Sequence, residues 1–167
     1  KEVILERTTK IEIVVSGKSA KQYHLLHEKI LINSDDAIER NNKIYIPFSL
    51  DESVLVNKAR VILKNGTVIH LDKKDIKEDV DQEKGMKYNY FAVNGLEKGA
   101  VIEKLYVLEE NPEFTGQTIK MQDDYPIGNI NFELIYPSYL VFKTKSYNGL
   151  SEPVINDKKI PNTVILA

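Results

Sequence analysis

The sequence predicts an all-β protein: an antiparallel two-sheet β-sandwich of about a dozen short strands, with at most one short helix. Short runs rich in β-branched and aromatic residues recur along the whole chain, and many of them have apolar residues at every second position. Turn residues separate these runs, and several Asn-Gly pairs are typical of hairpin turns. Helical patterns do not alternate with the strands, so a parallel α/β sheet is not expected.

The first half of the chain is expected to consist of strands joined by turns. The expected strands are residues 3–15, 23–32, 43–50, 54–64 and 67–72. In the first of these, Ile11, Ile13 and Val15 recur at every second position, as in a strand with one buried face. Asn65 and Gly66 connect the last two strands. Because both residue types tolerate positive φ, a two-residue type I′ turn is expected there.

Residues 72–85 are the one stretch with helical character. Ile76 and Val80 lie four residues apart, Asp75 is a candidate cap and Gly85 is a candidate stop. A solvated loop fits the low apolar content of this stretch equally well. The strands expected beyond it are residues 88–93, 100–110, 116–122, 129–137, 139–146 and 163–167. An Asn-Gly pair after residue 146 is expected to close another hairpin.

The composition is that of a globular domain with little electrostatic attraction for nucleic acids. The chain has 167 residues, of which 42% are hydrophobic and 29% are charged, and its formal net charge is −2. A chain of this length buries roughly 70% of its extended surface on folding, so residues 1–167 are interpreted as one domain with a real core. This balance excludes intrinsic disorder and predicts no nucleic-acid partner.

The chain lacks cysteine, which excludes disulfide bonds, thiolate nucleophiles and zinc sites with sulfur ligands. Its longest apolar runs, such as residues 11–15, are far shorter than the about 20 residues that cross a bilayer, so a transmembrane protein is not expected. The chain begins at Lys1 without an initiator Met. It is interpreted either as a protein whose signal peptide has been removed or as an excised N-terminal part of a longer exported protein.

The histidines are not expected to form a metal site. His24 and His27 are separated by an odd number of positions, which sends their side chains to opposite faces of a strand. His70 lies on a separate expected strand. We therefore predict no metal site, and nothing in the sequence implies a cofactor.

Acidic residues are plentiful but lack the spacing of a known site. Adjacent acids occur at residues 35–36, 51–52, 109–110 and 123–124. Such pairs could act as general acid and base, which requires carboxyl groups about 5 to 10 Å apart, or could bind calcium. The Asp-x-Asp-x-Asp-Gly calcium loop, the Gly-x-Ser-x-Gly nucleophile motif and a glycine-rich phosphate loop are all missing. We interpret the acids as solvated surface charge and predict no catalytic residues.

Four tyrosines are candidates for ligand contact. Tyr88 and Tyr90 share one face of an expected strand, and Tyr136 and Tyr139 lie in a second aromatic stretch. Exposed tyrosine rings would suit sugar stacking or a peptide groove, whereas half-buried tyrosines are common in sandwich cores. Burial decides between these two interpretations.

The middle and C-terminal parts of the sequence resemble a bacterial domain of unknown function that precedes transglutaminase-like cores. An Ala-Arg strand leads into an Asn-Gly hairpin, followed by a Phe-x-x-x-Gly-x-x-x-Gly-x-x-Ile-Glu segment and two strands marked by prolines. The resemblance covers roughly residues 40–145, with a weaker echo in the first strands. The matching residues are Ala59, Arg60, Asn65, Gly66, Phe91, Gly95, Gly99, Ile102, Glu103, Pro126 and Pro137.

This resemblance implies a non-catalytic module upstream of a papain-like cysteine core in an exported bacterial protein, in the periplasm or at the cell surface. The catalytic Cys, His and Asp would lie beyond Ala167, and a chain without cysteine cannot supply that nucleophile. The expected function is an accessory module that packs on the downstream transglutaminase-like domain or presents protein substrate to it. The alternative is a glycan-binding sandwich that uses the tyrosine clusters.

Overall fold

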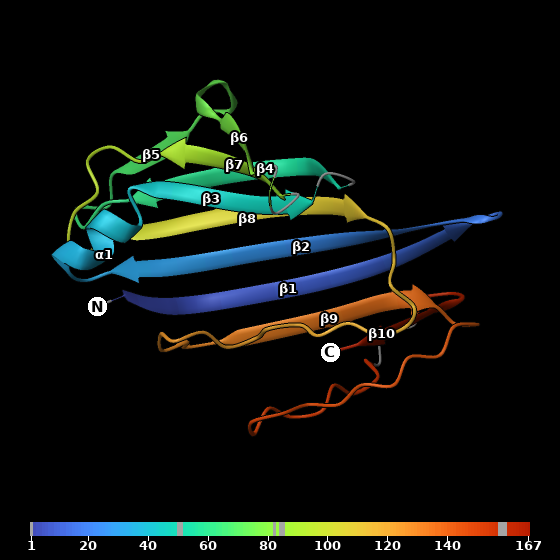
Figure 1. Cartoon of the computed structure of the whole chain (residues 1–167). Coiled ribbons are helices and arrows are strands. Elements are labelled where there is room, and N and C mark those ends of the chain that lie inside the picture. Colours follow the sequence, from blue (N-terminus) through green and yellow to red (C-terminus); the bar gives the residue numbers. More distant parts are fainter. Residues whose placement is uncertain (1, 50–51, 82, 84–85, 157–159) are drawn as a thin grey trace.

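A computed structural model describes residues 2–49, 52–81, 83, 86–156 and 160–167 of the chain. Its strands form a seven-stranded sheet in the order β10-β9-β1-β2-β8-β4-β5 and a three-stranded sheet in the order β3-β7-β6. Figure 1 shows the small sheet over one part of the large sheet. Strands β9 and β10 and the C-terminal segment lie toward the opposite edge of the large sheet. The predicted all-β, two-sheet fold is confirmed.

The strands differ widely in length, from four residues to fifteen. They are β1 (Glu2–Ser16), β2 (Ser19–Ile32), β3 (Lys43–Ser49), β4 (Ser53–Ile62), β5 (Val68–Leu71), β6 (Lys77–Asp81), β7 (Met86–Ala92), β8 (Val101–Glu110), β9 (Ile130–Pro137) and β10 (Thr163–Leu166). Their pairing is antiparallel, as predicted, apart from β1 with β9, which run parallel. The first two strands form a hairpin much longer than a short-strand sandwich would require.

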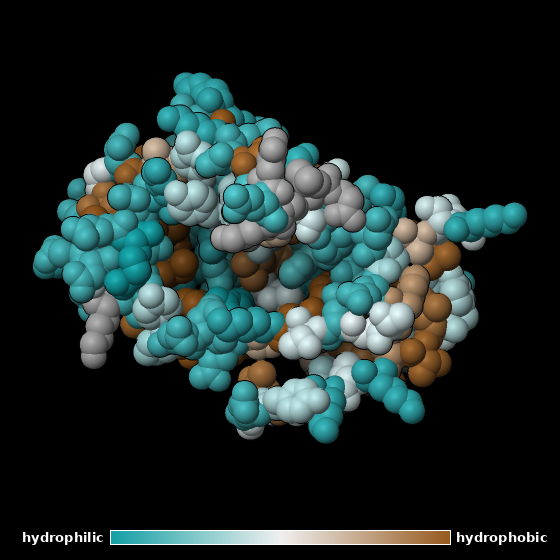
Figure 2. Space-filling view, in the orientation of Figure 1, coloured by the Kyte–Doolittle hydropathy of each residue, from teal (hydrophilic) through white to brown (hydrophobic). Residues whose placement is uncertain are grey.

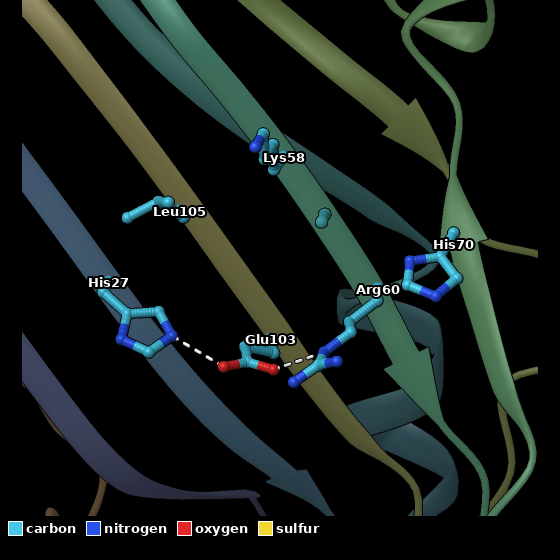
Figure 3. Close-up of a pocket in the computed structure, with 7 residues that line it drawn as sticks. His27, Lys58, Arg60, His70, Glu103 and Leu105 are labelled. Atoms are coloured by element: carbon cyan, nitrogen blue, oxygen red, sulfur yellow. Dashed lines mark hydrogen bonds and ion pairs between the residues drawn. The ribbon is translucent and has the colours of Figure 1, made fainter.

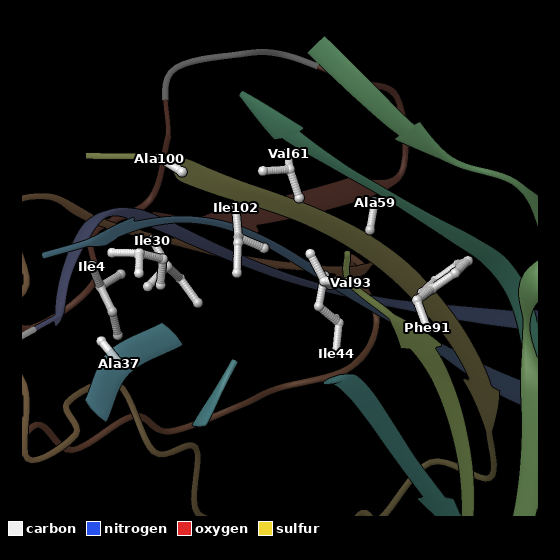
Figure 4. Close-up of a cluster of buried hydrophobic side chains, with 11 residues drawn as sticks. Ile4, Ile30, Ala37, Ile44, Ala59, Val61, Phe91, Val93, Ala100 and Ile102 are labelled. Atoms are coloured by element: carbon white, nitrogen blue, oxygen red, sulfur yellow. The ribbon is translucent and has the colours of Figure 1, made fainter. Parts of the chain in front are cut away.

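The main core lies between the two sheets. Residues at every second position of β2, β4 and β8 point toward the small sheet, and those of β3 and β7 point back toward the large one. Figure 4 shows the resulting cluster of aliphatic side chains, with Phe91 at one end of it. Burying a side chain of this size fully contributes about 1.5–3 kcal/mol to folding. The buried members are Ile4, Ile30, Ile32, Ala37, Ile44, Ala59, Val61, Phe91, Val93, Ala100 and Ile102.

A second cluster lies on the same face of the large sheet, near β9 and β10. Ile11, Ile13 and Leu134 are buried there with Tyr136 and Leu166. The side chains that cover this cluster come from irregular segments rather than from a second sheet, and they are Ile119, Leu140 and Phe142. Both segments, residues 116–122 and 139–146, were expected to be strands, and the structure shows that they are not. Their apolar side chains pack on the sheet, although their backbones do not pair with its strands.

The only α-helix of the described residues is α1 (Asp35–Arg40), and it lies in the polar break after β2. The Ser34 hydroxyl caps it by accepting a hydrogen bond from the Ala37 amide at 3.2 Å. Asp35 and Asp36 occupy the first turn and Arg40 the last, which suits the helix dipole. The helix has six residues, so the prediction of at most one short helix holds. It does not lie in residues 72–85, where the sequence left a helix and a solvated loop equally open.

Residues 72–81 instead form a 3₁₀ turn (Lys73–Asp75) followed by the edge strand β6. Asp72, rather than Asp75, caps the turn by accepting from the Lys74 amide. The acidic and basic side chains of β6 suit an edge strand, because charge discourages pairing with other chains. Gly85, the candidate stop, lies outside the described residues.

The hairpin between β4 and β5 is confirmed, but its turn is longer than the expected type I′ turn. The Leu63 amide donates to the Thr67 carbonyl at 2.8 Å, and the Gly66 amide donates to the Leu63 carbonyl at 2.9 Å. Gly66 has a φ of +86°, whereas Asn65 does not have positive φ. This is a type I turn closed by a glycine bulge, in which one residue rather than two needs positive φ.

Candidate functional site

Three tyrosines gather on the face of the small sheet that points away from the core, and we call Tyr45, Tyr88 and Tyr90 the tyrosine patch. Tyr45 of β3 lies directly opposite Tyr90 of β7. Their ring centroids are 5.5 Å apart with an interplanar angle of 34°, and Tyr88 meets the Tyr45 ring edge-on at 6.4 Å and 88°. Tyr45 still exposes 47% of its surface. The patch therefore presents aromatic surface to solvent.

Charged side chains surround the tyrosine patch. The Lys43 ammonium lies 5.4 Å from the centroid of the Tyr90 ring, close enough for a cation–π interaction. On the neighbouring strand β6, Lys77 lies opposite Tyr90 and Asp79 lies opposite Tyr88, so both share the face of the rings. Lys77 and Asp79 are exposed. Hydrogen-bond donors and an acceptor thus border an exposed aromatic surface.

The structure separates the four tyrosines singled out in the sequence. Tyr88 and Tyr90 lie together in the patch, whereas Tyr136 is only 6% exposed and packs edge-on against Phe142 at 4.8 Å in the second cluster. Tyr139 is exposed, but it lies beyond the end of β9 in a different part of the chain. Sequence reasoning missed Tyr45. The alternation of Ile44 and Ile46 with Tyr45 would have placed it on the outward face of the sheet.

A shallow pocket of about 260 Å³ lies on the face of the large sheet opposite the core. Figure 3 shows His27, Glu103 and Arg60 side by side on β2, β8 and β4, with His70 of β5 beside Arg60. The Glu103 carboxylate accepts from Arg60 Nε at 2.5 Å and lies 2.8 Å from His27 Nε2. Desolvation opposes ionisation of Glu103, but the hydrogen bonds from His27 and Arg60 outweigh it and lower its pKa.

His24 lies on the same strand as His27, but its side chain is on the opposite face of the sheet from His27, Glu103 and Arg60. Its Nδ1 lies 3.9 Å from the Glu110 carboxylate, on the core-facing side of the sheet. Burial lowers the pKa of His24, against the opposing effect of the Glu52 carboxylate. Among the described residues, no group of three or more His, Asp or Glu side chains is placed to hold a metal ion.

A charged network crosses the core-facing side of the large sheet between the two hydrophobic clusters. Arg7 of β1 bonds to Glu28 of β2 through Nε and to Asp123 through a terminal nitrogen. A further guanidinium nitrogen donates to the Met121 carbonyl at 3.1 Å, and Lys104 of β8 contacts the other Glu28 oxygen at 2.7 Å. This network fastens the segment before β9 to the sheet, which is a structural role.

Exposed apolar side chains concentrate after β9, in residues 138–156, which we call the C-terminal arm. The inner side of the arm packs Leu140 and Phe142 on the second cluster, and its end is held by two hydrogen bonds between Val154 and Ala167, each 2.9 Å long. Val141 is 85% exposed. Figure 2 shows hydrophobic surface on the side of the molecule where β9 ends, in contrast to the hydrophilic loop that projects at the top of the view between β5 and β6. The exposed apolar residues of the arm are Tyr139, Val141, Tyr147, Leu150, Val154 and Ile155.

Surface of this kind is typical of a contact with another protein or domain, because isolated soluble domains rarely gather so many exposed apolar side chains in one segment. No helix in the part of the chain that the structure describes is long and apolar enough to cross a membrane.

Comparisons with known proteins identify a family and a fold. The model of a family described as a domain of unknown function with solved structure, DUF3857, matches residues 18–163. A putative protease from Parabacteroides distasonis is similar in structure, with a TM-score of 0.76 and 13% sequence identity; the match covers 99% of this chain and 34% of that one. Aminopeptidase A from Legionella pneumophila matches with a TM-score of 0.47 and 9% identity, over 99% of this chain and 19% of that one. The comparison with curated proteins finds no match.

Proposed function

Because the chain belongs to the DUF3857 family of domains of unknown function, we propose that it is a non-catalytic accessory domain of a longer, exported protein. In that protein it packs on a transglutaminase-like catalytic domain and presents protein substrate to it. The transglutaminase-like partner follows from the sequence resemblance, in which such a core comes after this domain.

The exposed apolar C-terminal arm carries this proposal. The apolar side chains of Tyr139, Val141 and Val154 are exposed to water, which is unfavourable. Covering the arm with another protein surface would remove them from water and lower the free energy. In the resemblance, a catalytic core follows this domain in the same polypeptide. Such a domain is the occupant that we propose for the arm, because covalent linkage keeps its effective concentration high.

The solved structure most relevant to this proposal is that of the putative protease, of which this chain spans 34%. Its remaining length leaves room for a catalytic domain beside the shared fold. A role in presenting substrate also fits the free edges of the described sheets, since an exposed strand such as β5 can pair with an extended peptide.

The test is to express this chain and the polypeptide encoded downstream of it as two separate proteins and to measure their association by calorimetry. Val141→Asp combined with Val154→Asp should weaken binding at least about tenfold, as expected for apolar residues at the centre of an interface. Leu55→Asp is the control, because Leu55 is also an exposed aliphatic residue but lies on β4, outside the arm.

The substrate role is tested with the catalytic polypeptide alone and with this chain added. Addition should raise kcat/KM for a protein substrate and leave it unchanged for a short peptide that needs no presentation. A downstream sequence without a Cys-His-Asp domain, or two proteins that do not associate, would overturn the proposal.

A further inference from the structure

The tyrosine patch is aromatic surface that the fold itself does not use. The opposite face of the same strands supplies the core, where Ile44, Ile46 and Phe91 are buried. Because side chains alternate across a strand, Tyr45, Tyr88 and Tyr90 point away from that core. Folding of the small sheet therefore requires no aromatic residue at these three positions.

The rings of the patch hold one another in place. The tilted pair of Tyr45 and Tyr90 and the edge-on contact of Tyr88 with Tyr45 are both arrangements that aromatic pairs favour. A ring already held by such contacts loses little rotamer freedom when a ligand stacks on it. Tyr45 is at the centre of the patch and is its most exposed member, so it offers the main stacking surface.

The border of the patch supplies hydrogen-bonding groups on the same face. The exposed Asp79 carboxylate lies opposite Tyr88, and the exposed Lys77 ammonium lies opposite Tyr90. Asp79 already accepts one bond, from the Val80 amide at 2.9 Å, and a carboxylate has further lone pairs to offer. Lys43 adds a second ammonium over the Tyr90 ring.

This combination fits a sugar ring better than other stacking ligands. A pyranose has an apolar face of C–H groups, which an aromatic ring attracts, and hydroxyl groups around its rim that donate to carboxylates and accept from ammonium groups. Nucleic-acid bases also stack on tyrosine, but their phosphates require an electropositive groove. The face of the patch carries the Asp79 carboxylate as well as Lys43 and Lys77, and the net charge of the chain is −2, so this face is not a strongly electropositive groove.

We propose that the outward face of the small sheet binds a neutral glycan, with a pyranose ring stacked on Tyr45 and Tyr90 and its hydroxyls bonded by Asp79 and Lys77. This inference does not depend on the accessory role, because it involves neither the C-terminal arm nor a catalytic domain.

Binding is tested by titrating the 167-residue chain with three neutral hexasaccharides, namely cellohexaose, chitohexaose and maltohexaose, in a calorimeter. At least one should bind. The chain has nine tyrosines and no tryptophan, so tyrosine fluorescence should report the same event. For a hexasaccharide that binds, Tyr45→Ala should weaken affinity at least about tenfold, as expected when a central aromatic contact is removed.

Two controls separate stacking from a general loss of structure. Tyr45→Phe keeps the ring and should keep most of the affinity, whereas Tyr139→Ala removes a still more exposed tyrosine, in the C-terminal arm, and should change nothing. In the unaltered chain, amide NMR shifts on adding the sugar should cluster in β3, β6 and β7. The inference is overturned if none of the three sugars binds, if Tyr45→Ala binds as well as the unaltered chain, or if the shifts map elsewhere.

Discussion

Arg7 and Glu28 form an ion pair inside the protein. They lie directly opposite each other on β1 and β2, with Arg7 Nε 2.5 Å from a Glu28 oxygen, and both residues are buried. Desolvation opposes the charge on Arg7, but the bonds to Asp123 and Glu28 outweigh it and raise its pKa. The pair therefore stays ionised in an environment where a lone charge would be costly.

Removing one partner of this pair should be strongly destabilising. Arg7→Met leaves the buried Glu28 carboxylate with Lys104 as its remaining cationic partner among the described residues, so we expect a loss of about 3–5 kcal/mol in the free energy of unfolding. The double variant Arg7→Met with Glu28→Met should lose clearly less than the sum of the two single variants. Urea denaturation measures all three. The matched control is Lys98→Met, which removes an exposed pair with Asp35 and should cost less than about 1 kcal/mol.

Additive losses in the double variant would contradict this expectation, because they would mean that the two charges do not depend on each other in the folded state.

Gly66 should be sensitive to backbone strain rather than to crowding. It has a φ of +86°, yet a Cβ atom added there would meet nothing within 4 Å. Gly66→Val should therefore cost about 1–3 kcal/mol through strain alone. Gly66→Asn should cost much less, because asparagine tolerates positive φ. Thermal unfolding followed by circular dichroism compares the two variants, and equal losses would show that the bulged turn is assigned wrongly.

Local patterns predicted the parts of this fold in which one strand face is buried. Ile11 and Ile13 at alternate positions placed β1 correctly, and the Asn-Gly pair placed the β4–β5 hairpin. The same logic failed at residues 139–146, whose β-like composition reflects packing of Leu140 and Phe142 on a sheet rather than membership of one. Whether an apolar segment pairs with a strand or only packs on the face of a sheet depends on tertiary contacts, which cannot be read from the sequence alone.

The candidate surfaces were predictable to a smaller extent. Tyr88 and Tyr90 share a face by simple alternation, but their contact with Tyr45 depends on the pairing of β3 with β7. In the same way, Arg7 and Asp123 are separated by more than a hundred positions, and only the path of the chain before β9 brings them together. Pairings at such separations leave no short-range signal.

The stability of the protein should depend on pH through His24. Burial lowers its pKa in the folded state, with the Glu52 carboxylate opposing the shift. As pH falls below about 6.5, the unfolded histidine takes up a proton before the folded one does, and this proton binding stabilises the unfolded state relative to the folded state. The free energy of unfolding should therefore fall between pH 7 and pH 5 in denaturant titrations.

In His24→Gln this fall should be reduced, because glutamine does not titrate. His70→Gln is the control, since His70 is exposed on β5 and should leave the pH profile of the parent chain unchanged. A parent-like slope in His24→Gln would rule out His24 as its source.

Asn57 is a polar residue that is buried on the core-facing side of β4. It alternates with Ala59 and Val61 on β4 and so points toward the core, and neither atom of its side-chain amide has a hydrogen-bond partner among the described residues. Burying an amide without partners costs roughly 1–3 kcal/mol, and leucine has the same branched arrangement of side-chain heavy atoms without that cost. Asn57→Leu should therefore raise the free energy of unfolding by about 1–2 kcal/mol, measured by urea denaturation. Asn57→Asp should lower it, because a buried carboxylate is costlier still. A less stable Asn57→Leu variant would mean that the amide is satisfied in solution, and Asn57 would then count among the polar contacts that fix the packing of the two sheets.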